Sequence, residues 1–81
     1  MNKEESKFII SPNPATDQVT FTLSENSSND NWIEIYNNLG QLVRTTRPME
    51  NYSVQNLPRG LYEVKLISKE GIQESKRIFL K

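Results

Sequence analysis

The amino-acid sequence predicts an all-β protein, and three features of the chain support this. Apolar residues alternate with polar ones, as in "QVTFTL" at residues 18–23 and "YEVKL" at residues 62–66. This period of two is typical of half-buried strands. No stretch places apolar residues at the i, i+3, i+4, i+7 spacing over the length of a helix. Turn residues separate the alternating runs at roughly the eight to twelve residue spacing of a β-sandwich.

The alternating runs predict about seven strands, which are rich in β-branched and aromatic residues. In order along the chain they are residues 7–11, 18–24, 31–37, 41–46, 51–54, 60–68 and 75–81. We expect the core to contain Phe21, Ile33, Ile35, Tyr62, Val64 and Leu66, with Trp32 partly buried. Short antiparallel strands with this spacing favour two sheets packed face to face, an immunoglobulin-like antiparallel β-sandwich.

The first connection, "SPNPATD" at residues 11–17, contains two prolines that flank Asn13. Proline has no backbone N–H and fixes φ near −65°. It also pushes the residue before it out of the helical region. Proline is tolerated in sheets at edges, strand starts and bulges. We therefore expect this segment to end an edge strand, at a point where the chain crosses over.

Glycine and proline mark three further turns. Gly40 in "NNLGQ" suits the left-handed position of a bulged hairpin, and Pro58 and Gly60 in "LPRG" suit a type I turn. Gly71 in "KEGI" indicates another tight hairpin. The polar run at residues 24–31 is expected to be a plain loop, because it lacks the alternating ligands and central glycine of a calcium loop.

The composition argues against catalysis and metal binding. The chain has 81 residues, enough for one small domain, with 35% hydrophobic residues, no cysteine and no histidine. Neither a histidine-activated nucleophile nor a usual zinc site can be built without these residues. The acidic residues are scattered, as solvated carboxylates usually are. We expect a protein that is not an enzyme and has no cofactor.

The charges are balanced but unevenly distributed. The formal net charge is zero, which argues against a nucleic-acid or anionic-membrane partner. Residues 8–43 carry four acidic and no basic residues, whereas residues 44–81 carry eight basic and four acidic residues. One interpretation is that oppositely charged strands pair across a sheet. The other is a basic patch near the C terminus that another protein recognises.

The order of four segments resembles a known family. "SPNPATDQVTF", "IEIYNNLGQLV", "LPRGLYEVKL" and "KRIFLK" are together similar to the type A C-terminal sorting domain of type IX secretion cargo, over residues 8–81. The positions that match the sorting motifs are Pro12, Asn13, Pro14, Tyr36, Gly40, Gly60, Tyr62, Val64 and Lys65. Lys76, Arg77 and Lys81 match its basic terminal strand. Ser11 and Glu63 depart from the pattern, since apolar residues are common there.

The resemblance implies a non-catalytic secretion signal, covalently part of a larger cargo protein. The cargo would cross the periplasm and pass the type IX outer-membrane translocon to the cell surface or medium. A surface sortase-like peptidase would then remove the domain. The basic residues of the last strand would contact the translocon, which could add a strand beside it. We further expect a monomer without membrane insertion. Residues 1–7 have no apolar run, and we expect a linker there, with Met1 an artificial start.

A second class of function stays open. An immunoglobulin-like domain can also serve an extracellular enzyme as a carbohydrate-binding or spacer module. Sugar sites usually expose several aromatic faces, and this chain has one tryptophan and three tyrosines. A screen for glycan binding discriminates between the two functions.

Overall fold

The computed structural model describes residues 7–24 and 30–81, which form seven strands. They are β1 (Phe8–Ser11), β2 (Gln18–Leu23), β3 (Trp32–Tyr36), β4 (Leu42–Thr46), β5 (Tyr52–Ser53), β6 (Gly60–Ser68) and β7 (Gly71–Leu80). The predicted all-β class is confirmed. In these two described ranges, no helix is long and apolar enough to cross a membrane.

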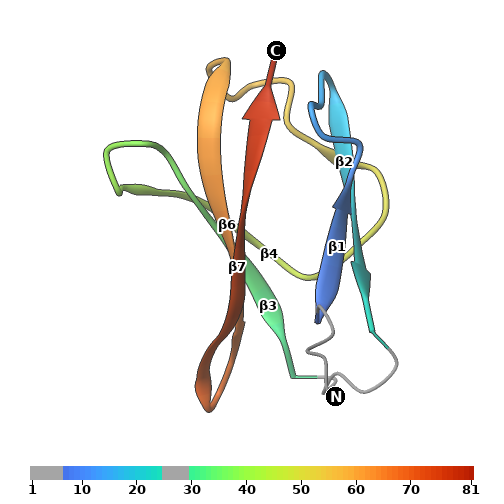
Figure 1. The fold of residues 1–81 in the computed structure, drawn as a ribbon, viewed down its shortest axis with the longest axis vertical. Coiled ribbons are helices and arrows are strands. Elements are labelled where there is room, and N and C mark those ends of the chain that lie inside the picture. The colour runs from blue at the N-terminus through green and yellow to red at the C-terminus, as the bar shows by residue number, and fades with distance from the viewer. Residues whose placement is uncertain (1–6, 25–29) are drawn as a thin grey trace, which may run out of the picture.

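The strands form two antiparallel sheets that pack together as a sandwich (Figure 1). The smaller sheet has the order β1-β2-β5, and the larger has the order β4-β3-β6-β7. In Figure 1, the blue and cyan β1–β2 hairpin faces the orange and red β6–β7 hairpin. Strand β1 is an edge strand of the smaller sheet and β7 is an edge strand of the larger.

The core lies between the two sheets, where the inward residues of each strand meet. All six residues predicted to be buried are buried, and Ile33, Ile35, Val64 and Leu66 have no exposed surface. The other sheet contributes Phe8, Ile10, Val19 and Phe21. Trp32 is half-buried, as predicted. The burial of these residues explains why apolar and polar residues alternate along the strands, because apolar side chains stabilise the fold only on the inward face of each strand.

The predicted hairpin turns are confirmed by the backbone. Gly40 has φ of +84°, and the N–H of Asn37 donates to the carbonyl of Gln41 at 2.9 Å to close the β3–β4 hairpin. Gly71 has φ of +114° and pairs with Ser68 in the β6–β7 hairpin. Only glycine adopts such angles without steric cost.

Two expectations about the extent and connection of the strands were wrong. The segment 11–17 ends an edge strand but does not cross over, because β1 and β2 are antiparallel neighbours in one sheet. The last strand begins at Gly71 instead of residue 75, because it pairs with β6 along its whole length. Main-chain pairing thus outweighs the weak strand pattern of residues 71–74. The predicted linker, apart from Lys7, and most of the predicted 24–31 loop lie outside the described residues.

Candidate functional site

The four motif segments come together at one end of the sandwich, here called the motif end. It comprises residues 13–16, the turn at 37–41, residues 57–61 and the strand end at 77–81. Figure 1 shows the β1–β2 connection, the start of β6 and the C terminus together at the top of the view. The motif position Tyr36 directly precedes the 37–41 turn of this end, and Gly40 lies within that turn.

Asn13 connects the first motif to the last strand. Its side-chain Nδ2 donates to the carbonyl of Arg77 at 3.2 Å, and its Oδ1 accepts from the N–H of Phe79 at 3.0 Å. Pro12 and Pro14 have no N–H to offer, and both of their peptide bonds are cis. The amide side chain of Asn13 therefore supplies the donor and the acceptor that a neighbouring strand would supply.

Ala15 continues this contact along the same edge of β7. Its N–H donates to the carbonyl of Phe79 at 2.9 Å, and its carbonyl accepts from the N–H of Lys81 at 2.9 Å. The segment around Ala15 runs parallel to the end of β7, and the Ala15 side chain is fully buried. Residues 13–15 thus cover the outer edge of β7 from residue 77 to residue 81.

Arg59 ties the same region together, although the sequence pattern of residues 57–60 predicts only a turn. Its Nη1 donates to the carbonyl of Thr16 at 2.5 Å. Its Nη2 donates to the carbonyls of Val54 at 2.6 Å and Leu57 at 2.8 Å. A longer contact of 3.4 Å reaches the oxygen of Lys81. A turn pattern predicts the backbone of a residue and not the reach of its side chain, so the sequence carried no signal for this role.

The hydrogen-bonded turn before β6 spans residues 54–57, where the N–H of Leu57 donates to the carbonyl of Val54 at 3.1 Å, and not the predicted 57–60. Tyr62 and Gly60 shape the bend at 57–60 that follows it. The Tyr62 ring is buried, and its hydroxyl donates to the carbonyl of Pro58 at 2.5 Å. Gly60 has φ of +140°, in the region that favours glycine. The next inward residue, Val64, is a core residue. These motif positions therefore have contacts inside the fold.

The basic residues of the last strand do not share one face. Lys76 points toward the β1 side, where its Nζ lies 3.8 Å from a Glu74 carboxylate oxygen and 6.0 Å from the centre of the Phe8 ring. Arg77 lies exposed on the opposite, outer face, across from Glu63. Lys81 is exposed beyond the end of β7. Arg77 borders a hollow in the surface.

That hollow has a volume of about 320 Å³ and lies between the 37–41 turn and the β6–β7 ladder. A second hollow of about 180 Å³ adjoins it toward the 57–60 bend. The residues common to both are Asn37, Asn38, Leu61 and Tyr62. Together the two hollows form a groove across the motif end.

A polar ladder occupies the outer face of β3. The Glu34 carboxylate accepts from the Tyr36 hydroxyl at 2.6 Å and from the Trp32 indole N–H at 3.1 Å. These two hydrogen bonds lower the pKa of Glu34, helped by Lys65 and opposed by slight desolvation. The bond to Glu34 in turn raises the pKa of Tyr36. Lys65 lies directly opposite Glu34 on the neighbouring strand β6, and its Nζ is 4.5 Å from the centre of the Tyr36 ring.

Charges from the two halves of the chain do meet across the larger sheet. Glu34 lies opposite Lys65, and Asp30 pairs with Lys69 at 3.5 Å. This supports the first of the two interpretations of the uneven charge distribution, that oppositely charged strands lie side by side.

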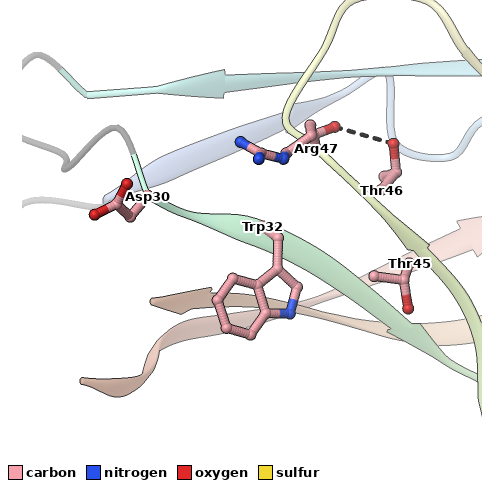
Figure 2. A pocket seen from close by; sticks show the side chains of 5 residues that line it. All are labelled: Asp30, Trp32, Thr45, Thr46 and Arg47. Carbon is pink, nitrogen blue, oxygen red and sulfur yellow. Dashed lines mark hydrogen bonds between the residues drawn. The ribbon is translucent and has the colours of Figure 1, made fainter. Parts of the chain in front are cut away.

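An open depression of about 520 Å³ lies at the other end of β3. It is lined by Asp30, Trp32, Thr45, Thr46 and Arg47 (Figure 2). The Thr46 hydroxyl donates to the carbonyl of Arg47 at 3.1 Å. Within residues 7–24 and 30–81, no group of three acidic side chains is placed to hold a metal ion.

Comparison with known protein families gives a match that spans nearly the whole chain. A family described as the secretion system C-terminal sorting domain matches residues 9–81. Searches of curated proteins and of solved structures found no match. The match contains all four motif segments that meet at the motif end. The chain therefore belongs to the family of type IX secretion system C-terminal sorting domains.

Proposed function

We propose that residues 8–81 are a non-catalytic signal that directs a larger cargo protein through the type IX outer-membrane translocon. In this proposal the cargo crosses the periplasm and reaches the cell surface or medium, where a sortase-like peptidase cuts upstream of the domain. The family match over residues 9–81 is the observation that carries the proposal. No nucleic acid, metal or cofactor takes part in it.

The sorting-motif residues act in this proposal mainly by building the motif end. Asn13 holds the last strand, Tyr62 holds the 57–60 bend, and Lys65 lies over the Tyr36 ring. Contacts of this kind hold a surface in one shape. The translocon then recognises the assembled surface and not a linear sequence.

Fusing residues 1–81 behind a periplasmic reporter in a type IX-competent host tests the proposal. The reporter is expected on the surface or in the medium, and in the periplasm of a matched host that lacks the translocon. Mass spectrometry of the released reporter is expected to place the cut before residue 8. Retention of a folded fusion in the periplasm of the competent host would contradict the proposal.

Changing Lys76, Arg77 and Lys81 together to glutamine tests the role of the basic strand. Arg77 and Lys81 are exposed, and exposed charges contribute up to about 1 kcal/mol each to stability, whereas Lys76 is half-buried beside Glu74, so the melting temperature of the purified variant is measured to show that it folds. Its export is expected to fall. Undiminished export of the folded variant would assign these charges to ordinary solvated surface.

One observation favours the second candidate, carbohydrate binding. Trp32 lines an open depression with Asp30, Arg47 and two threonines (Figure 2). An aromatic face beside hydrogen-bonding groups suits a sugar ring. A glycan screen with the wild-type domain and Trp32→Ala decides: binding that Trp32→Ala abolishes supports this candidate, and no binding removes it.

A further inference from the structure

We propose that the groove across the motif end is the docking site of the domain, and that an extended acidic segment of a translocon protein occupies it. The segment places a carboxylate on Arg77 and an apolar side chain on Leu61 and Phe79. This inference rests on the proposed function and narrows it to one surface and one partner chemistry.

Charge complementarity selects Arg77. Arg77 takes part in neither ion pair found among residues 7–24 and 30–81, Lys69 with Asp30 and Lys76 with Glu74, although Glu63 lies opposite it on β6 and lines the same hollow. It lies exposed at the rim of the 320 Å³ hollow. A guanidinium offers its donors in a planar fork that matches a carboxylate. The two hollows together are lined by two arginines, Arg59 and Arg77, and one glutamate, Glu63, so the net charge of the groove favours an acidic partner.

Leu61, which lines the groove, and Phe79, which lies beside it on β7, supply the apolar part of the docking surface. They are directly opposite each other on β6 and β7, and Leu61 is 43% exposed and Phe79 47% exposed. The Glu63–Arg77 pair is their neighbour on the same outer face, two residues along each strand. Adjacent apolar side chains with a polar rim are typical of a protein contact.

The structure also argues against strand addition at the end of β7. Residues 13–15 already use the outward N–H and carbonyl groups of Phe79, the carbonyl of Arg77 and the N–H of Lys81. A partner strand beside residues 77–81 would have to displace them. The partner therefore contacts the outer face of the sheet through side chains.

A charge reversal with a matched control tests the role of Arg77 in the reporter fusion. Arg77→Glu is expected to lower export by roughly tenfold or more, as the loss of a desolvated charge pair does. Lys69→Glu makes the same charge reversal at an exposed cation at the other end of the β6–β7 hairpin and is expected to leave export unchanged. Arg77→Gln, with its melting temperature measured on the purified domain, separates lost recognition from lost folding. Wild-type levels of export with Arg77→Glu and Arg77→Gln would overturn the proposal.

Photocrosslinking in the exporting cell tests the occupant. p-Benzoylphenylalanine is placed at Leu61 in the groove or at Ile72, which is 60% exposed at the other end of β7. We expect an adduct from position 61 to a translocon protein, at a peptide that contains aspartate or glutamate, and its loss in Arg77→Glu. An adduct only from position 72, an adduct to an outer-membrane glycolipid, or a partner peptide without acidic residues would each overturn the proposal. Export of the wild-type reporter fusion in the same cells shows that the proposed function holds, whichever of these crosslinking results is obtained.

Discussion

The side-chain amide of Asn13 pairs with the backbone of Phe79 as a strand would, with its Oδ1 3.0 Å from the Phe79 nitrogen. The same amide reaches the carbonyl of Arg77, so one side chain satisfies two main-chain groups of an edge strand. An exposed strand edge invites pairing with other chains. Asn13, the residue between the two prolines, therefore helps to close this edge through its side chain, since the prolines on either side have no backbone N–H.

Substitution of Asn13 is expected to destabilise the domain. Asn13→Ala should lower the free energy of unfolding by about 1 kcal/mol, the net value of such hydrogen bonds. Asn13→Asp should cost more, because a carboxylate oxygen would face the carbonyl of Arg77. Urea denaturation at constant slope measures both changes. The exposed Asn38, substituted by alanine, is the control, and an Asn13→Asp variant as stable as wild type would contradict this role.

Substitution of Arg59 is expected to loosen the motif end. Arg59→Lys keeps the charge, but a lysine ammonium cannot bridge carbonyls that surround a planar fork. We expect a loss of about 1–3 kcal/mol, since the guanidinium donates to Thr16, Val54 and Leu57. Thermal unfolding measures the loss, with Arg47→Lys as the exposed control. Equal melting temperatures for both variants would show that the guanidinium contacts add nothing.

Gly60 is expected to tolerate no side chain, for a backbone reason. Its φ is +140°, yet a Cβ built there would have no atom within 4 Å. The strain thus comes from the backbone angle and not from crowding. Gly60→Val and Gly60→Ala should each destabilise by roughly 1–3 kcal/mol. A melting temperature unchanged by Gly60→Ala would mean that the bend is misassigned.

Glu34 is expected to make stability depend on acid pH. Its pKa is lowered in the folded state, chiefly by the Tyr36 hydroxyl and then by the Trp32 indole. A carboxyl group with a lowered folded pKa stabilises the fold above its ordinary pKa near 4.5, and this contribution is lost as the pH falls through the folded value. Melting temperatures from pH 7 to pH 2 should fall less steeply for Glu34→Gln than for wild type. Parallel curves for the two proteins would contradict the prediction.

Several features of the fold could be predicted from the sequence because they depend on local properties. Alternation assigns Ile33, Ile35 and Val64 to a buried face whichever strand lies next to them. Gly40 and Gly71 mark hairpins because few other residues adopt a positive φ. Alternation also places Lys76 and Arg77 on opposite faces of β7, so their role in recognition stays a prediction that the triple glutamine variant tests.

The motif end was decided by the tertiary structure. Asn13 contacts residues more than sixty positions away, and Arg59 reaches Thr16 from a distant bend. Periodicity assigns a face to each residue but does not determine which strands are neighbours. Only the packing of the two sheets brings β7 beside residues 13–15, and only strand pairing within the larger sheet places Arg77 at the rim of a hollow next to Leu61. The sequence by itself determined the strands, most turns and the family motifs, because these depend on local backbone preference and alternation. The partners of Asn13 and Arg59, and the place of Arg77 beside the hollow, depend on long-range contacts, which no local pattern encodes.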